Sequence, residues 1–301
     1  MRAVVFGNRE MGCACLEEVL RQGVEVPLVV TYPPDPGEAP GFRSLAEVAS
    51  ERGLSVAAPP DARGTRLLGA VRGARPDLIL SFYYGHRLPA SLLASPRIGA
   101  YNMHGSLLPR WRGRAPLPFV LLHGDRESGA TLHAMVEEFD AGEIFGQERF
   151  AVDPRETATT LYRKTVDAAI RVLREALPAL VDGRARGTPM DPALAVDTRP
   201  LMPLRELDVS ATVERFDRTV RAFARPYPGA RVPFGAGAAV VWDGEPVAGP
   251  VGIPLRLADG VYSVRRLGVE GGPEMDAASF LRRYPDATAA LGQPPPGAPG
   301  R

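Results

Sequence analysis

The sequence predicts an α/β fold in which a Rossmann-like, mostly parallel sheet is followed by a smaller C-terminal domain that is β-rich and barrel-like. In the first half, apolar runs typical of buried strands alternate with amphipathic segments typical of helices, as in repeated βαβ units. Later apolar segments are short and separated by Gly and Pro, as in small β domains. With 301 residues, the chain is long enough for two domains. We expect a first domain at 1–183, a linker at 184–205, a second domain at 206–290 and a disordered tail at 291–301.

The first expected strand is Arg2–Gly7 (RAVVFG), which is apolar and ends at a glycine. A helix is expected at Met11–Gln22, because Leu16, Val19 and Leu20 recur at helical spacing and share one face. The other strands expected before residue 105 are Val24–Thr31, Leu54–Ala58, Pro76–Phe82 and Ile98–Met103. The other helices expected there are Phe42–Arg52 and Thr65–Arg72. Parallel sheets place ligand sites at the carboxyl ends of their strands, so residues that follow these strands are the first site candidates.

Two strands and a long helix are expected to complete the first domain, at Thr131–Val136, Ile144–Val152 and Thr157–Val181. From Asp182 to Pro203 the periodic pattern gives way to Gly, Arg, Pro and Asp, which is typical of a linker. A helix at Val213–Ala224 opens the second domain. Its expected β segments are Ala238–Trp242, Pro254–Leu257 and Gly260–Val264.

Charge and composition exclude several classes of function. The chain has 36 basic and 35 acidic residues, and this balance provides no general attraction for nucleic acid or for an anionic membrane. It has no run of about 18 apolar residues, so no membrane span is expected. The only cysteines, Cys13 and Cys15, have a spacing that suits neither a disulfide framework nor a zinc site. We therefore expect a cytoplasmic protein.

Several common catalytic motifs are absent. The first strand-to-helix turn reads GNREMG and lacks the G-x-G-x-x-G spacing of nicotinamide cofactor sites, and no phosphate-binding G-x-x-x-x-G-K-[ST] loop occurs. Ser106 follows Gly105 without the G-x-S-x-G context of a serine nucleophile. His123 and His133 lie on different expected elements, so we interpret them as surface or packing histidines. We predict no metal site.

The end of the strand at 98–103 carries the strongest chemical signal. Asn102 and His104 are two residues apart, so their side chains project from the same face while Met103 points into the core. An Asn amide can donate to an oxygen that becomes negative, and a His can exchange a proton near neutral pH. Asp140, in a loop after a strand of the same sheet, is the candidate to align the imidazole and raise its pKa by charge attraction. In the alternative interpretation, Asn102, His104 and Ser106 only satisfy backbone groups of a turn.

Three arginines follow in the same turn. Arg110, Arg112 and Arg114 cluster around Trp111. These arginines could simply belong to a solvated loop. They could also bind an anionic ligand, because guanidinium groups pair well with carboxylate and phosphate.

The stretch NMHGSLLPRWRGRAPL at 102–117, with FDAGEI at 139–144, resembles the fingerprint of the N10-formyltetrahydrofolate-dependent formyltransferase family. That fingerprint is Asn-x-His-x-Ser-x-Leu-Pro-x-x-x-Gly, followed by an Asp-x-Gly loop. The resemblance covers most of residues 1–183 and implies the formyltransferase fold. The segments SFYYGHRLP, DPGEAPGF and GATLHAMVEEFDAGEI are most similar to the branch that acts on UDP-4-amino-4-deoxy-L-arabinose, in lipopolysaccharide or lipid A modification.

The resemblance implies transfer of a formyl group from 10-formyltetrahydrofolate to a primary amine, without a metal. It implies that Asn102 stabilises the formyl oxyanion, that His104 handles the proton of the amine and that Asp140 supports His104. It also implies that the folate lies along His86, Arg87, Leu88, Arg114, Val136, Glu137, Glu138, Phe139 and Asp140.

Charge also bears on the acceptor. Proteins that grip tRNA use basic patches, and the loop after the second strand is basic in methionyl-tRNA formyltransferases. Here the loop Tyr32–Gly41 contains Asp35, Glu38 and no basic residue. Beyond Pro203 the chain has 12 Arg and 11 acidic residues, an excess of one positive charge. Both observations favour a small nucleotide-linked amino sugar, such as UDP-4-amino-4-deoxy-L-arabinose, over nucleic acid.

Other acceptors and one non-enzymatic role remain open. Methionyl-tRNA and another small amine, such as hydroxyornithine, are alternative acceptors. A folate-binding scaffold without activity is disfavoured, because Asn102, His104 and Asp140 are present together. The second domain matches the family only weakly, through FDRTVRAFARPYPGA at 216–230, which leaves the sugar and its nucleotide open. A homodimer is also open.

Overall fold

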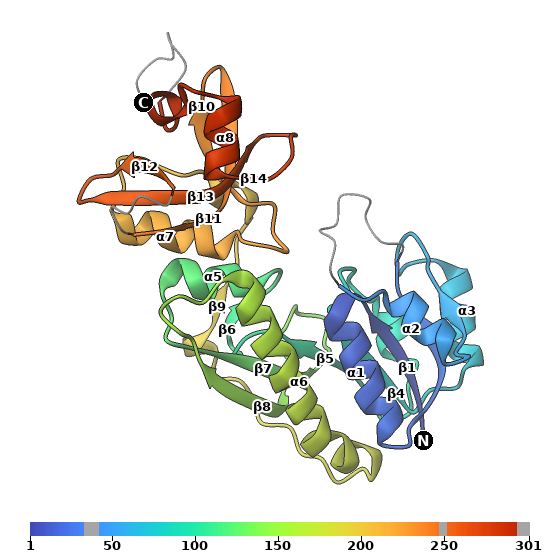
Figure 1. The fold of residues 1–301 in the computed structure, drawn as a ribbon. Helices are drawn as coiled ribbons and strands as arrows, with labels where there is room; N and C mark the ends of the chain where they lie inside the picture. The colour runs from blue at the N-terminus through green and yellow to red at the C-terminus, as the bar shows by residue number, and fades with distance from the viewer. Residues whose placement is uncertain (33–41, 247–251, 294–301) are drawn as a thin grey trace. The chain divides into compact units, whose positions relative to one another are not determined.

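The computed structural model of the protein describes residues 1–32, 42–246 and 252–293 (Figure 1). Apart from Tyr32, the loop on which part of the acceptor prediction rests lies outside these residues. So does the predicted tail from residue 294 onward. Within the same tail, Leu291 is buried and forms an isolated β-bridge with Phe234.

The described residues form two compact units. The first comprises residues 1–116, 127–152 and 162–199, and the second comprises 117–126, 153–161 and 200–301. The second unit thus takes in two short segments from the first 183 residues. The domain boundaries expected from the sequence remain a prediction.

A seven-stranded sheet is the centre of the first unit, with the order β3-β2-β1-β4-β5-β7-β8. Its strands are β1 (Arg2–Gly7), β2 (Glu25–Val30), β3 (Val56–Ala57), β4 (Leu78–Phe82), β5 (Gly99–His104), β7 (Glu127–Ala134) and β8 (Ile144–Ala151). The pairs from β3 to β5 are parallel, whereas β5–β7 and β7–β8 are antiparallel. The predicted mostly parallel α/β sheet is confirmed.

Helices cover the sheet because its central strands are apolar on both faces. The helices with residues in the first unit are α1 (Arg9–Arg21), α2 (Leu45–Glu51), α3 (Thr65–Gly73), α4 (Ala90–Leu93), α5 (Pro116–His123) and α6 (Ala158–Val181). Val4 and Phe6 of β1 pack with Leu67 and Val71 of α3 in one core cluster. Ala3 and Val5 point to the opposite face and are also fully buried, as expected for a central strand with period two.

Several elements were not expected from the sequence, among them α4 in the first unit and α5, which apart from Pro116 lies in the second unit. Strand β6 (Arg110–Arg112) pairs in parallel with β9 (Val196–Asp197), which lies in the segment predicted as a linker. Helix α5 was missed because its sequence, PLPFVLLH, is apolar throughout and shows no helical periodicity. The segment around β9 also contains 3₁₀ turns at Pro192–Leu194 and Met202–Arg205.

The second unit contains an antiparallel sheet with the order β10-β11-β13-β12, and β14 pairs with β13. Its strands are β10 (Ala230–Phe234), β11 (Gly237–Glu245), β12 (Ile253–Arg256), β13 (Val261–Val269) and β14 (Met275–Asp276). Its own helices are α7 (Val213–Ala222), α8 (Ala277–Arg283) and α9 (Ala287–Ala290). The β-rich character is confirmed, whereas α8 and α9 were not predicted.

A buried carboxylate ties α7 to the rest of the second unit. Asp217 is 6% exposed and accepts hydrogen bonds from Arg155 (2.7 Å), Arg221 (2.7 Å) and the Tyr262 hydroxyl (3.3 Å). Arg155 belongs to the segment 153–161, so this network joins that segment to α7 and β13.

We predict that Asp217→Asn destabilises the protein. The neutral amide loses the charge-assisted hydrogen bonds, each worth about 1.5–3 kcal/mol, and the free energy of unfolding in urea should fall by a similar amount. The control Glu214→Gln alters only an exposed pair with Arg218 and should change it by less than about 1 kcal/mol. Equal effects of the two variants would contradict the importance of the buried network.

Candidate active site

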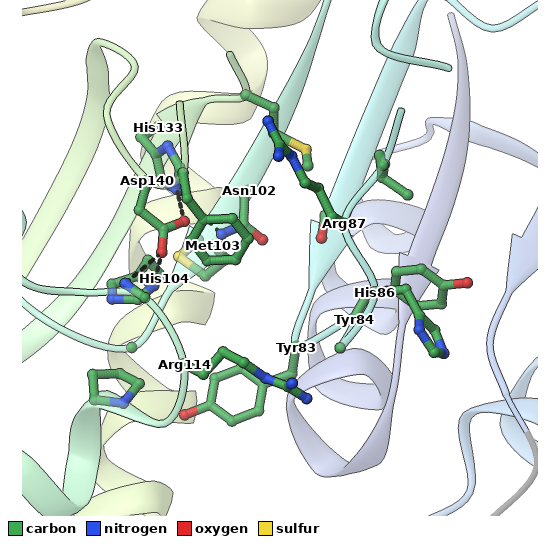
Figure 2. A pocket seen from close by; sticks show the side chains of 18 of the residues that line it. Tyr83, Tyr84, His86, Arg87, Asn102, Met103, His104, Arg114, His133 and Asp140 are labelled. Carbon is green, nitrogen blue, oxygen red and sulfur yellow. Dashed lines mark hydrogen bonds and ion pairs between the residues drawn. The ribbon is translucent and has the colours of Figure 1, made fainter. Parts of the chain in front are cut away.

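One pocket of the first unit lies where β4 and β5 end (Figure 2). Its walls come from the segment after β4, the end of β5, the turn before α5 and the loop after β7. The position agrees with the rule that α/β sheets bind ligands outside the carboxyl ends of parallel strands.

Asn102 and His104 reach this pocket from the last residues of β5. They share a face because they are two residues apart on a strand. Met103 is 1% exposed and also contributes to the pocket lining. The hydroxyl of Ser106 donates to the carbonyl of Arg110 (2.6 Å), so Ser106 serves the turn and not the pocket wall.

Asp140 approaches the same place from the loop after β7 (Figure 2). One carboxylate oxygen, Oδ2, lies 3.4 Å from Nδ1 of His104 and accepts a hydrogen bond from the backbone N–H of Gly113 (2.9 Å). The structure therefore brings together the three residues that the sequence singled out. Their catalytic roles are developed under the proposed function.

The hydrogen-bond partners of His104 determine which of its nitrogens can act. Nε2 lies 2.8 Å from the carbonyl of Trp111, which can only accept, so Nε2 carries a proton. In the neutral ring, Nδ1 is then the nitrogen that can take up a proton. As expected, the attraction of Asp140 acts to raise the pKa of His104. Burial outweighs the attraction of Asp140 and lowers the pKa, so the neutral ring is favoured.

Asp140 behaves in the opposite way to an isolated buried carboxyl. Burial acts to raise its pKa, but the two neighbouring imidazoles and the Gly113 N–H outweigh burial and hold the pKa below its ordinary value. A neutral His104 can accept a proton, and the ionised Asp140 beside it would stabilise the imidazolium that forms.

His133 belongs to this cluster, although the sequence interpretation placed it in packing. Its Nε2 lies 3.1 Å from Nδ2 of Asn102 and 3.4 Å from Oδ1 of Asp140. Its proximity to Asn102 arises from the tertiary structure, because the antiparallel register of β5 and β7 sets His133 directly opposite Asn102. Spacing along the sequence does not show that pairing.

Several residues around the pocket, including two in the turn between β5 and α5, have an unusual backbone conformation. Six non-glycine residues in the described part of the chain have positive φ, and three of them, Tyr83, Ala115 and Asp140, line the pocket. A fourth, Trp111 (φ 60°), supplies the carbonyl that contacts His104. Strain of this kind persists where the surroundings impose it, which is common at functional sites.

Strand β9 contributes to holding that turn. The Trp111 carbonyl and the Gly113 N–H flank Arg112, whose carbonyl accepts from the N–H of Thr198 (2.8 Å). The guanidinium of Arg112 pairs with Asp197 (2.8 Å) and with Glu138 (3.2 Å). The segment predicted as a linker therefore supports both backbone groups that contact the catalytic candidates.

Seven of the nine residues that were predicted to bind folate line the pocket, and two do not. His86, Arg87, Leu88, Arg114, Val136, Phe139 and Asp140 line the pocket. Glu137 and Glu138 do not: the Glu137 carbonyl accepts from Arg87, and the Glu138 side chain pairs with Arg112. The Arg87 contact joins the segment after β4 to the loop after β7. The binding roles of all nine residues remain predictions.

The pocket combines apolar walls with an available cation. Leu88 and Leu93 line it from the segment after β4 and from α4, and the exposed Val136 (46%) and Phe139 (49%) line it from the loop after β7. Arg114 is exposed, and no carboxylate among the described residues pairs with it. Such a pocket suits a flat heteroaromatic group that carries an anionic extension.

The part of the chain that the structure describes contains neither a metal-binding cluster nor a membrane-spanning helix. Among residues 1–32, 42–246 and 252–293, no group of three or more His, Cys, Asp or Glu side chains is arranged to hold a metal ion. No helix in the same ranges has the length and apolarity needed to cross a membrane.

We predict that His104 makes the protein less stable in mild acid. A histidine whose pKa is lowered by folding binds fewer protons in the folded state, so stability falls as the pH drops below the ordinary value of 6.5. Asp140, also lowered by folding, adds a further loss below its ordinary value of 3.8. Between pH 8 and pH 5, the Tm of His104→Gln should therefore fall by less than the Tm of the wild type.

The control for this measurement is His86→Gln, which changes an exposed histidine. This variant should follow the wild-type curve of Tm against pH. Parallel curves for all three proteins would contradict the stabilised neutral state of His104.

We predict that Gly142→Ala disturbs the Asp140 loop. A Cβ at Gly142 would lie 2.1 Å from the carbonyl oxygen of Ala134, which cannot move freely within β7. The free energy of unfolding should fall by about 1–3 kcal/mol, as for other overpacked sites. The control Gly69→Ala in α3 has no atom within 4 Å and should be neutral or slightly stabilising.

Comparisons with known structures show the same fold. A variant of HypX from Aquifex aeolicus matches with a TM-score of 0.72 and 16% identity, over 100% of this chain and 50% of that one. The chain thus spans half the length of HypX. An N-formyltransferase from Helicobacter canadensis, solved with folinic acid and dTDP-3-aminofucose, matches with a TM-score of 0.65 and 16% identity, over 87% of this chain and 98% of that one. A sugar N-formyltransferase from a Shewanella species matches with a TM-score of 0.63 and 18% identity, over 77% and 92%.

The sequence also matches a protein-family model. The model describes formyl transferases and aligns with residues 1–177, which contain β1 to β8, Asn102, His104 and Asp140. Because the aligned region exceeds half of the chain and contains the whole pocket, the protein belongs to the formyl transferase family.

Proposed function

We propose that this formyltransferase moves a formyl group from 10-formyltetrahydrofolate to the primary amine of a nucleotide-linked amino sugar. The observation that carries the proposal is the convergence of Asn102, His104 and Asp140 on one pocket wall. Together they supply a hydrogen-bond donor, a proton acceptor and a carboxylate, which are the groups that acyl transfer to an amine requires.

The folate would supply the formyl group, and the pocket offers suitable groups to hold it. The apolar side chains Leu88, Leu93, Val136 and Phe139 fit the two faces of a pterin. Arg114, which has no carboxylate partner among the described residues, suits the glutamate part of the molecule. The Helicobacter enzyme binds folinic acid and HypX binds tetrahydrofolic acid, which supports a folate donor.

Each side chain of the wall has a role in this proposal. Asn102 donates an amide N–H to the formyl oxygen as negative charge develops on it. His104 accepts a proton from the amine at Nδ1, because Nε2 is engaged with the Trp111 carbonyl (2.8 Å). The Asp140 carboxylate, 3.4 Å from Nδ1, stabilises the imidazolium that results. The imidazolium then returns the proton to N10 of the folate as the bond between N10 and the formyl carbon breaks and tetrahydrofolate leaves.

The acceptor is inferred from charge and from relatives. The near-neutral charge of the chain argues against tRNA. The Helicobacter enzyme binds dTDP-3-aminofucose, which supports a nucleotide-linked amino sugar as the class. Within that class, the sequence resemblance favours UDP-4-amino-4-deoxy-L-arabinose.

A second candidate is folate-dependent formyl transfer to a different acceptor. HypX aligns with 100% of this chain, including the second unit, whereas the Helicobacter sugar enzyme aligns with 87%. Because similarity of fold at 16% identity does not select an acceptor, other small amines are offered in the assay as well.

We predict that His104→Ala lowers kcat by about 10²–10⁴-fold, the usual contribution of general acid–base catalysis. Asn102→Ala should lower kcat by about 10²–10³-fold, as for loss of one oxyanion donor. Asp140→Asn should also reduce turnover strongly, and Asp182→Asn, at an exposed carboxylate paired with Arg184, is its matched control. Wild-type turnover in a folded Asn102, His104 or Asp140 variant would remove that residue from the mechanism.

The assay follows release of tetrahydrofolate from 10-formyltetrahydrofolate. UDP-4-amino-4-deoxy-L-arabinose, dTDP-3-aminofucose, hydroxyornithine and charged initiator tRNA are offered separately. Formylation of a nucleotide sugar alone supports the proposal. Formylation of hydroxyornithine or tRNA alone would replace the acceptor, and release without any acceptor product would indicate a hydrolytic reaction instead.

A further inference from the structure

We propose that His133 is a positioning residue that sets the orientation of the Asn102 amide. The inference rests on the proposed function, because it assigns His133 a purpose in stabilising the formyl oxygen. It starts from the contact between Nε2 of His133 and Nδ2 of Asn102, at 3.1 Å.

The proton position on His133 follows from its other nitrogen. Nδ1 lies 2.9 Å from the carbonyl oxygen of Ala134, which can only accept a hydrogen bond. Nδ1 therefore carries a proton. In the neutral ring, Nε2 has a lone pair and can only accept, so it requires a donor.

Asn102 is the donor that the structure provides. Its NH₂ group has two N–H bonds, and one of them is taken by Nε2 of His133. The other N–H remains for a second acceptor, and Asn102 lines the pocket where the formyl oxygen would lie. Without the imidazole acceptor, the amide could rotate by half a turn and present its own oxygen, which would repel a developing negative charge.

The packing leaves His133 little freedom. His133 is 2% exposed, and the backbone N–H of its strand neighbour Ala134 donates to the carbonyl of Glu143 (2.9 Å), in the loop that carries Asp140. The antiparallel register of β5 and β7 places the two residues opposite each other. A fixed series of hydrogen bonds therefore leads from the Ala134 carbonyl through His133 to Asn102 and ends in the pocket.

One contact opposes this arrangement and defines the alternative. Nε2 of His133 also lies 3.4 Å from Oδ1 of Asp140, whose other oxygen faces His104. If His133 carried protons on both nitrogens, Nε2 would donate to Asp140 and Asn102 would have to turn its oxygen toward the ring. The contact with Asn102 is the shorter of the two, which favours the neutral arrangement.

The first test needs no enzymatic activity. Long-range ¹H–¹⁵N NMR of the imidazole rings reports which nitrogen is protonated, and the chain has only 4 histidines to assign by substitution. At pH 7.5 we expect a neutral His133 with its proton on Nδ1, and a shift of the Nε2 signal in Asn102→Ala. A proton on Nε2, or a doubly protonated ring, overturns the inference.

The second test is a double-mutant cycle with 10-formyltetrahydrofolate and UDP-4-amino-4-deoxy-L-arabinose, or whichever acceptor the wild type formylates in the assay above. His133→Leu should lower kcat by about 10–100-fold, as for loss of other supporting hydrogen bonds, with little change in the KM for the folate. In the Asn102→Ala background the same substitution should have little further effect, because both changes remove one interaction. A full additional loss in that background would overturn the inference.

The conservative variant His133→Gln separates positioning from packing. Its Oε1 can accept from Asn102 at about the place of Nε2, so its kcat should lie well above that of His133→Leu. If both variants are equally slow although both fold, the acceptor role is wrong. If the wild type formylates no acceptor while the NMR result is as expected, the proposed function fails and the hydrogen bond stands.

Discussion

A buried carboxylate needs polar or positively charged neighbours, and the site depends on how Asp140 meets this requirement. Its side chain is 7% exposed, and its partners come from three separate parts of the chain: His104 at the end of β5, His133 on β7 and the N–H of Gly113 in the turn. Burial of an unpaired carboxylate would be strongly unfavourable. The strand end, the antiparallel strand and the turn are therefore held together by a single side chain.

The same requirement extends to the backbone around Asp140. The carbonyl of Trp111 contacts His104, and the carbonyl of Ala134 contacts His133, so each imidazole is fixed from its far side. Trp111 and Asp140 both have positive φ, and Gly142 leaves room for the Ala134 carbonyl. Dipoles that are held in place before the reaction need no reorganisation when charge develops, which is the main source of electrostatic catalysis.

Charge states connect this architecture to acyl transfer. Burial favours a neutral His104, and the groups around Asp140 favour its ionised form, so the pair is ready to accept a proton and to stabilise it. In the proposed reaction, the residues on this wall act on the formyl group and on the amine nitrogen, which all acceptors of this class share. The wall thus explains the reaction type without selecting among acceptors, and the choice of sugar must depend on other contacts.

The sequence by itself determined the parallel α/β sheet, because its buried strands are continuous apolar runs, and it determined Asn102, His104 and Asp140 as candidates through local spacing and a family resemblance. Only the tertiary structure decided that His133 faces Asn102, since that contact depends on strand register between residues 31 positions apart. It also decided that β9 supports the turn and that Glu137 and Glu138 are not among the residues that line the pocket. The direction of the His104 pKa was decided there too, because burial and charge attraction oppose each other and only the packed site shows which prevails.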